Sequence, residues 1–295
     1  MVKARVIELK SYKDRRMTSP LPTPSSWVDP LHRFTQWMRA SDYPRSTQDK
    51  RHYHLRRFAN TSGLGPFEPT TDDLIDYLGS HDWSAQTKRS HRATLRAFYS
   101  WAHAAGATTT DPAALLPIVR TQPGTPRPIP ESELRQALAT AGERERLMIR
   151  LGAEASMRSC EICLVNVADV IGQVGSHSIV VHGKGNKIRV VPIDDGLAVT
   201  LLERGRRNAG GWVFEGKING HLSNKRVIEL LADALPGKWA GHSLRHRYGT
   251  ITYQGSQDIR SVQENMGHAS VATTQIYTGI DDEQRRRASA FAKIA

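Results

Sequence analysis

The sequence is poor in cysteine and contains no long apolar run. Its 295 residues include two cysteines, Cys160 and Cys163, too few for a disulfide framework and typical of a reducing compartment. No apolar stretch approaches the roughly 18 residues of a membrane span. The N-terminus shows no apolar segment of the secretory type. These absences exclude the integral membrane and disulfide-rich secreted classes, and we expect a cytoplasmic protein.

Acidic residues are also few relative to basic ones. The chain has 29 Asp plus Glu against 41 Lys plus Arg, which gives a formal net charge of +12. Both halves of the chain are basic. Because a basic surface attracts polyanions, of which nucleic acids are the commonest, we expect a nucleic-acid partner.

Two spacings suggest metal or redox chemistry, and neither is complete. Cys160 and Cys163 have the spacing of a redox pair or of half a zinc site, but no second cysteine pair follows, so buried helix positions are the better interpretation. His242 and His246 form His-x-x-x-His, but Ser243 stands where a zinc protease needs glutamate. We therefore predict no metal site and no cofactor.

The first part of the chain is predicted to be helical. Residues 1–26 are rich in lysine, arginine, proline and serine, which indicates a flexible basic arm. Residues 27–116 carry apolar residues at helical spacing and are predicted to form a helical domain. Its last helix, which opens at Ser84, has a basic face away from its apolar stripe, and its candidate DNA-contacting residues are Lys88, Arg89, Arg92 and Arg96.

A proline-dense segment, residues 117–130, is predicted to be an interdomain linker. Helices and a small sheet follow it in residues 131–281, and the predicted helices include Glu131–Thr140, Glu143–Glu154 and Ser270–Tyr277. The expected strands are 167–170, 178–182 and 187–193, and the last two are joined by a Gly-Lys-Gly-Asn hairpin turn. The predicted fold class is mainly α with a small antiparallel β-sheet in the C-terminal domain.

Several residues suited to phosphate chemistry follow one another in the second domain. The three-residue spacing of His242 and Arg245 puts an imidazole and a guanidinium on one helix face, where both could grip a phosphate. Further basic and hydroxyl groups precede and follow this pair. In chain order the set is Arg158, Lys184, His242, Arg245, His268 and Tyr277, with Glu161 one helical turn after the first arginine.

This order and spacing resembles the tyrosine recombinase (phage integrase) family. The most specific stretches are His-Ser-Leu-Arg-His, from His242, and Gly-His-Ala-Ser-Val-Ala-Thr-Thr-Gln-Ile-Tyr, which ends at Tyr277. One departure precedes Arg158, where Ala-Ser-Met stands in place of the family's usual Thr-Gly-Leu. The resemblance extends from about Trp27 to the C-terminus.

The resemblance implies a reaction that breaks and rejoins DNA strands without ATP or a metal. Tyr277 would attack phosphorus and form a covalent 3′-phosphotyrosine, and Lys184 would protonate the departing 5′-oxygen. The two arginines and two histidines would stabilise the charge on the phosphate, and Glu161 would orient the site. Lys187 and Arg247 are further candidate DNA contacts.

The resemblance also implies an assembly. The helical domain and the catalytic domain, residues 131–281, would form a C-shaped clamp around double-stranded DNA at core-type sites. Four copies would act together on DNA, residues 282–295 would dock onto a neighbouring subunit, and a directionality factor is a possible partner. The short stretch before the first helix leaves no room for a separate arm-binding domain, so we expect either a compact phage or mobile-element integrase or a chromosome-dimer-resolving recombinase. The irregular Ala-Ser-Met stretch before Arg158 favours the integrase.

Three alternatives stay open at this point. A chromosome-dimer-resolving recombinase would carry the same residues. A type IB-like topoisomerase shares the chemistry but acts as a monomer, and the predicted docking segment argues against it. A catalytically inactive DNA-binding regulator would retain the fold alone, and the presence of all six residues argues against decay.

Overall fold

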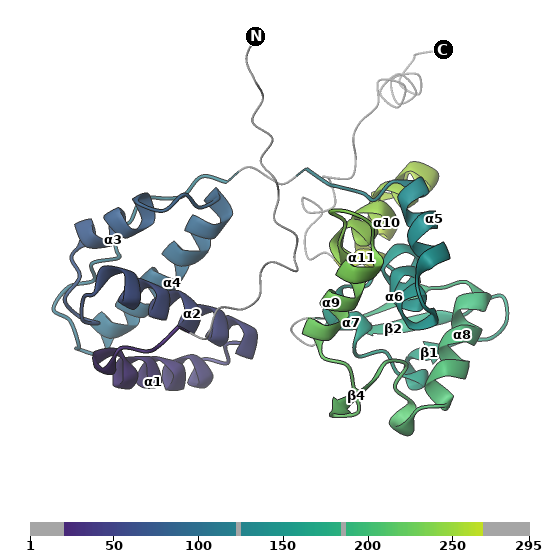
Figure 1. The fold of residues 1–295 in the computed structure, drawn as a ribbon, viewed down its shortest axis with the longest axis horizontal. Coiled ribbons are helices and arrows are strands. Elements are labelled where there is room, and N and C mark those ends of the chain that lie inside the picture. Colours follow the sequence, from purple (N-terminus) through teal and green to yellow (C-terminus); the bar gives the residue numbers. More distant parts are fainter. Residues whose placement is uncertain (1–20, 122–124, 184–186, 268–295) are drawn as a thin grey trace, which may run out of the picture. The chain divides into compact units, whose positions relative to one another are not determined.

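The computed structural model describes residues 21–121, 125–183 and 187–267. The chain divides into two compact units, Met1–Gln122 and Pro123–Ala295, and the division falls inside the predicted linker 117–130 (Figure 1). Three of the predicted catalytic residues, Lys184, His268 and Tyr277, lie outside the described residues, as do the predicted docking segment 282–295 and a helix predicted over 270–277. Among the described residues, no helix has the length and apolar character needed to cross a membrane.

Four helices make up the described part of the first unit, and several of their ends follow from capping residues. Thr70 and Asp73 make a reciprocal capping box, Ser84 accepts a hydrogen bond from the Thr87 N–H, and Gly63 ends its helix with a φ of 70°. Aromatic rings fill the core, where Trp27 stacks on Phe98. The helices are α1 (Ser25–Ala40), α2 (Arg45–Ser62), α3 (Thr71–Gly79) and α4 (Ala85–Ala104).

The segment before α1 differs from the flexible arm predicted over residues 1–26. Helix α1 begins at Ser25, and the residues just before it run along α2. The Leu21 carbonyl accepts a 3.3 Å hydrogen bond from Arg56, and the Pro22 carbonyl accepts a 2.8 Å bond from Asn60. Prolines lack an N–H but keep a carbonyl acceptor, so this proline-rich segment docks through its carbonyl groups.

The second unit packs helices around a small sheet, which confirms the predicted fold class. Helices α5 and α6 coincide with the residues predicted for them. The elements are α5 (Glu131–Thr140), α6 (Glu143–Glu154), α7 (Ser159–Ile162), η2 (Val167–Asp169), β1 (Val170–Ile171), β2 (Ser178–His182), β3 (Ile188–Pro192), α8 (Asp195–Arg206), η3 (Ala209–Gly211), β4 (Glu215–Ile218), α9 (Asn224–Ala234), α10 (Gly241–Ser256) and α11 (Ile259–Met266).

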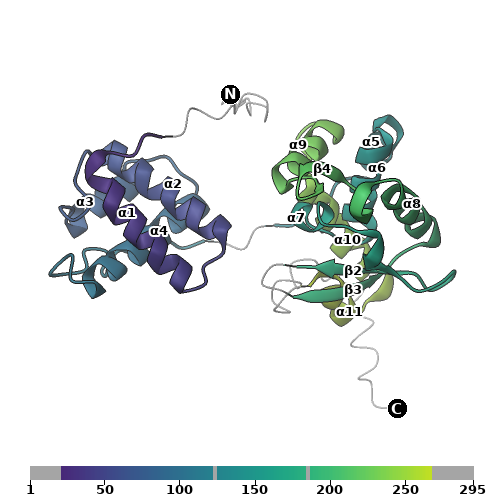
Figure 2. The same cartoon turned by 90° about the horizontal axis from the view of Figure 1, so that it is seen from below.

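The three-stranded sheet is antiparallel, in the order β1-β2-β3, with Val180 opposite Val190. Strand β3 lies beside α11 (Figure 2). The first strand, predicted over 167–170, is shorter because Asn166 caps a 3-10 turn by accepting from the Ala168 N–H. Asn and Asp compete with strand pairing through such local bonds.

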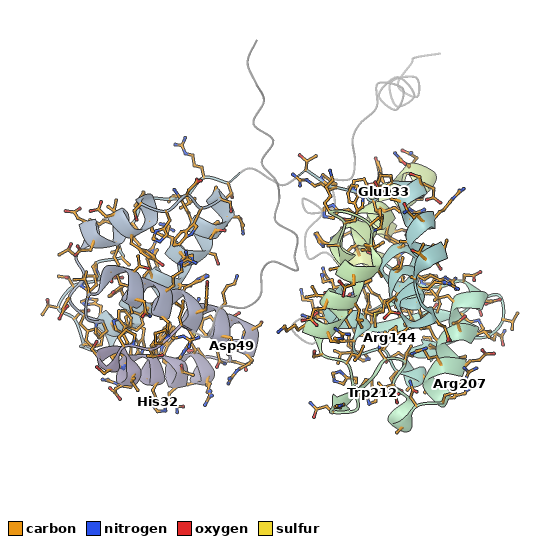
Figure 3. All side chains as sticks on the ribbon, viewed as in Figure 1. His32, Asp49, Glu133, Arg144, Arg207 and Trp212 are labelled. Atoms are coloured by element: carbon orange, nitrogen blue, oxygen red, sulfur yellow. The ribbon has the colours of Figure 1, made fainter. Side chains whose placement is uncertain are left out.

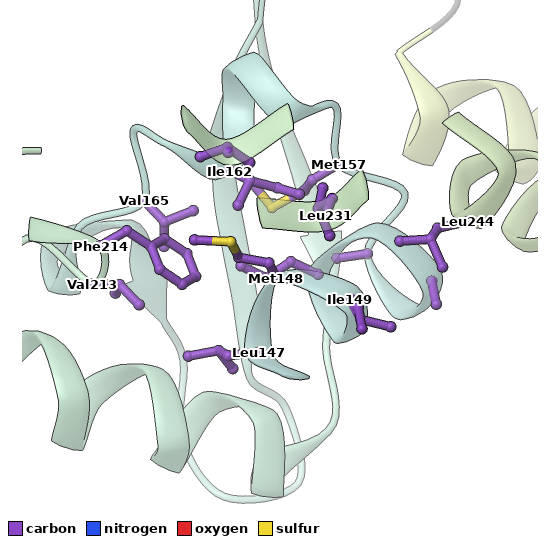
Figure 4. Close-up of a cluster of buried hydrophobic side chains, with 14 of the residues drawn as sticks. Leu147, Met148, Ile149, Met157, Ile162, Val165, Val213, Phe214, Leu231 and Leu244 are labelled. Carbon is purple, nitrogen blue, oxygen red and sulfur yellow. The ribbon is translucent and has the colours of Figure 1, made fainter. Parts of the chain in front are cut away.

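Helix α6 is the centre of the second core (Figure 4). Leu147, Met148, Ile149 and Leu151 are all buried, whereas Arg146 and Glu154 of the same helix are exposed. Gly152 allows α10 to approach closely, because a Cβ there would lie 2.9 Å from Leu244 Cδ1. Near the start of α10, Trp239 Nε1 donates a 2.7 Å hydrogen bond to Glu133 of α5, a residue labelled in Figure 3. These contacts fix the helix that carries His242 and Arg245.

Candidate active site

Arg158 and Glu161 are joined by a short local motif at the start of α7. The Arg158 backbone N–H donates a 2.8 Å hydrogen bond to Glu161 Oε2, and its side chain donates a 2.7 Å bond to Oε1. The Arg158 side chain is 36% exposed, whereas that of Glu161 is 1% exposed. Glu161 therefore holds one side of the Arg158 guanidinium, while the rest of that group reaches solvent.

Arg189 contacts the same carboxylate and is not among the site residues predicted from the sequence. It donates hydrogen bonds of 2.9 Å to Glu161 Oε1 and 2.8 Å to Oε2, and its Nε donates a 2.8 Å bond to the Asn265 carbonyl. One signal could have revealed it. Arg189 shares the inner face of β3 with the buried Val191, and a buried arginine requires a carboxylate partner.

The ionisation of Glu161 reflects these contacts. Burial alone would raise the pKa of this carboxyl group, but hydrogen bonds from Arg189 and from Arg158 outweigh it and lower the pKa to about 2. Glu161 is therefore an anion at neutral pH. The cluster of two guanidiniums and one carboxylate carries a net positive charge.

Arg245 is held from two directions inside the domain. It is 1% exposed, and its two terminal nitrogens donate to the carbonyls of Ser156 and Met266. A guanidinium has five N–H donors, and these carbonyls accept two. Ser156 lies in the unusual Ala-Ser-Met stretch and has a φ of 54°, a conformation that favours glycine. Ser156 therefore adopts a left-handed conformation at the position where the family pattern has glycine.

The two histidines of α10 pack against each other. The rings of His242 and His246 meet edge to face with centroids 4.3 Å apart. His246 Nδ1 accepts a 3.3 Å hydrogen bond from the Arg127 N–H, and burial lowers the pKa of His246 to about 4, so this ring is neutral. Burial, followed by the charges of Arg245 and Arg158, lowers the pKa of His242. Within the described ranges, no three His, Cys, Asp or Glu side chains gather in a way that could hold a metal.

The candidate DNA contacts occupy different settings. Arg89 and Arg96 are exposed on α4, and Arg89 reaches Thr121 at 3.1 Å. Arg92 donates to the Leu116 carbonyl at 2.8 Å and so ties α4 to the end of its own unit. The remaining candidates are half-buried Lys88, exposed Lys187, and Arg247, which forms a 2.6 Å ion pair with Glu131.

Comparison with known proteins agrees with this arrangement. The phage integrase family matches residues 128–284, slightly more than half of the chain. Tyrosine recombinase XerC of Vibrio atlanticus (strain LGP32) is 28% identical over 88% of this chain and 91% of its own. Tyrosine recombinase XerC of Xanthomonas axonopodis pv. citri (strain 306) is 31% identical over 67% of this chain and 68% of its own.

Solved structures show the same fold. The XerH site-specific recombinase bound to its difH substrate superposes with a TM-score of 0.66 at 20% identity and covers 92% of this chain and 85% of its own. A lambda integrase dimer bound to a COC′ core site gives 0.67 at 17% identity, covering 87% of this chain and 77% of its own. The family match over the second unit and the relatives that span most of the chain identify this protein as a member of the phage integrase family, a tyrosine site-specific recombinase.

Proposed function

We propose that the second unit cuts and rejoins duplex DNA through Tyr277. The single observation that carries this proposal is the cluster in which a buried carboxylate holds the Arg158 guanidinium at 2.7 Å, close enough to His242 for the charges of both Arg245 and Arg158 to act on that ring. These groups, with Arg245, come from α7 and α10, and they converge although 84 residues separate His242 from Arg158 in the chain. Such convergence of cations is what a phosphate that gains charge in the transition state requires.

Each described residue has a role that its environment supports. Arg158 is exposed enough to bind a non-bridging phosphate oxygen, and Glu161 fixes its direction. Arg245 is immobilised by two carbonyls, so its guanidinium has a fixed position and direction in the site. Because the pKa of His242 is lowered, its ring is neutral at pH 7 and donates through one N–H without adding a full charge.

The proposed covalent step uses Tyr277, Lys184 and His268, which lie outside the described residues. The Tyr277 oxygen forms a bond to phosphorus, the bond from phosphorus to the 5′-oxygen breaks, and the Tyr277 proton leaves to solvent or a neighbouring base. Lys184 gives its proton to the departing 5′-oxygen, and His268 adds a donor to the phosphate. The phosphodiester energy is kept in the 3′-phosphotyrosine, so a 5′-hydroxyl can reverse the step on another strand.

We extend the proposal to the DNA partner. The exposed arginines of α4, with Lys88 and Lys187, bind phosphates, and Arg247 exchanges Glu131 for a phosphate when DNA is present. A lambda integrase tetramer has been solved bound to a Holliday junction, and we propose that four copies of this chain likewise act together, with residues 282–295 as the docking segment. Binding would weaken steeply with salt.

Two biological roles use this chemistry. Integration and excision of a mobile element was favoured by the unusual Ala-Ser-Met stretch, but the left-handed Ser156 still presents its carbonyl to Arg245, so that stretch does not separate the roles. Resolution of chromosome dimers is favoured by the match to a recombinase called XerC along about nine-tenths of both chains. We propose integration and excision of a mobile element as the role of this protein, with resolution of chromosome dimers as the alternative.

The experiment that separates these proposals traps the covalent intermediate on nicked suicide substrates drawn from the DNA of the source cell. Sequencing of the trapped DNA distinguishes a site present once in the chromosome from the ends of an element. Binding without an adduct would indicate a regulator. Supercoil relaxation in strict proportion to protein concentration, with no recombinant product, would indicate a monomeric topoisomerase.

A further inference from the structure

We propose that Arg189 is a positioning residue that neutralises Glu161 and thereby keeps the positive charge of Arg158 available to the scissile phosphate. This inference rests on the proposed function, because it concerns how the same phosphate is bound. Nothing about the strand position of Arg189 requires a cation there. Its neighbours on β3, Ile188 and Val190, are apolar and exposed.

The carboxylate of Glu161 is shared between two arginines. Its Oε1 accepts from Arg158 at 2.7 Å and from Arg189 at 2.9 Å. Its Oε2 accepts from the Arg158 backbone N–H and from Arg189, each at 2.8 Å. Arg189 thus takes the bidentate position, and the Arg158 side chain is left with a single bond to the carboxylate.

Burial explains why this division of partners matters. The Arg189 side chain is 10% exposed and that of Arg158 is 36% exposed, so Arg189 forms the inner ion pair and Arg158 faces solvent. Without Arg189, Arg158 would be the only cation of the described residues within hydrogen-bonding distance of the buried carboxylate. The pair of Arg158 and Glu161 would then be neutral overall. Arg158 would direct its paired N–H groups toward the Glu161 carboxylate rather than toward a phosphate.

Arg189 also fixes the end of α11, from which the chain continues to His268. The last carbonyls of a helix have no partner within it. Here the Asn265 carbonyl accepts from Arg189 and the Met266 carbonyl accepts from Arg245. Gly267 follows with a φ of 61°, and a Cβ there would lie 3.0 Å from Arg189 Cδ. One guanidinium therefore holds both Glu161 and the start of the segment toward Tyr277.

The test compares cleavage of a normal phosphodiester with cleavage of a methylphosphonate, in which a methyl group replaces one charged oxygen. We expect Arg189→Met to slow cleavage of the phosphodiester about 10- to 100-fold, the range for loss of a residue that orients a ligand. On the methylphosphonate the loss should shrink to about threefold or less, since the charge that Arg158 must meet is gone. Arg189→Lys, which keeps the charge but loses the fork, should fall between.

The matched control is Arg204→Met, which removes a part-buried arginine of α8 that donates to the Val213 carbonyl away from these residues. It should cleave both substrates as the wild type does. Adding Glu161→Gln to Arg189→Met should restore part of the phosphodiester rate, because the unbalanced anion is removed. Equal losses on both substrates with no such rescue, or an unimpaired Arg189→Met, would overturn the inference. A wild type that forms no Tyr277-dependent adduct would instead overturn the proposed function.

Discussion

Arg189 and Glu161 lie 28 residues apart in the chain and meet through two parallel hydrogen bonds of 2.9 and 2.8 Å. This pair joins β3 to α7, and through the Asn265 carbonyl it also joins both elements to the end of α11. The residues proposed to hold the phosphate therefore share one buried framework. Changes within that framework should affect stability and catalysis together.

The first prediction concerns the stability of this ion pair. Glu161→Ala leaves Arg189 buried without its carboxylate, and breaking one side of a buried pair costs about 3–5 kcal/mol in the free energy of unfolding. The double variant with Arg189→Met should lose clearly less than the two single losses together. Urea unfolding of all four proteins measures the coupling. Single losses that simply add would show that the two side chains do not act as a pair.

The second prediction concerns the left-handed Ser156. Its φ of 54° suits glycine, and its buried Oγ has no hydrogen-bond partner among the described residues. Ser156→Gly should therefore raise the free energy of unfolding by about 0.5–1 kcal/mol, while its carbonyl remains available to Arg245. Ser156→Ala is the matched control, since it removes the hydroxyl but keeps the Cβ strain, and it should gain less. A glycine variant that unfolds more easily than the wild type would contradict this account of the turn.

The third prediction concerns acid sensitivity of the first unit. The rings of His54 and His91 stack with centroids 3.8 Å apart, and burial lowers the pKa of His54 to about 4 and that of His91 to about 3. Both rings are neutral in the folded state, whereas in the unfolded chain they take up protons near pH 6.5. Stability is then full above about pH 6.5 and declines as the pH falls toward 4.

Thermal melting between pH 7 and pH 4.5, followed by tryptophan fluorescence, measures this decline. His91→Gln should flatten it even though the variant is less stable at pH 7. The control is His103→Gln, at an exposed position of α4, which should keep the wild-type slope. An unchanged slope in His91→Gln would show that the stacked pair does not cause the acid sensitivity.

The fourth prediction concerns the two thiols. Cys160 is exposed and Cys163 is buried, and burial raises the pKa of Cys163 to about 11. At pH 8 a thiol reagent such as DTNB should titrate one thiol in the native protein and both after denaturation. Cys160→Ser should abolish the native reaction. If both thiols, or neither, reacted rapidly with DTNB in the native protein, the exposure of Cys160 and the burial of Cys163 would be contradicted.

Much of the fold could be predicted from the sequence because local signals were strong. Helix α3 begins after Thr70, whose type is favoured at the N-cap, and α5 and α6 span the predicted residues. The first strand was predicted too long because Asn166 favours a local turn over strand pairing. The arm was predicted too long because its carbonyl contacts with Arg56 and Asn60 are tertiary and leave no pattern in the sequence.

The candidate site was predictable in its residue types but not in its supporting contacts. Spacing placed His242 with Arg245, and the structure holds both on α10. The role of Arg189 depends on pairing between a strand and a distant helix, and such pairing cannot be derived from residue spacing. Arg247 is a candidate phosphate contact, and the structure adds that it pairs with Glu131, 116 residues earlier. Long-range charge pairing decided both outcomes.

The central claim is that Tyr277 becomes covalently linked to DNA, and one measurement tests it most directly. The wild type, Tyr277→Phe and Arg204→Met are incubated in EDTA with nicked suicide substrates and run on a denaturing gel. We predict a protein–DNA adduct with the wild type and with Arg204→Met, and none with Tyr277→Phe. An adduct that persists in Tyr277→Phe, or DNA binding by the wild type without an adduct on any substrate, would contradict the account.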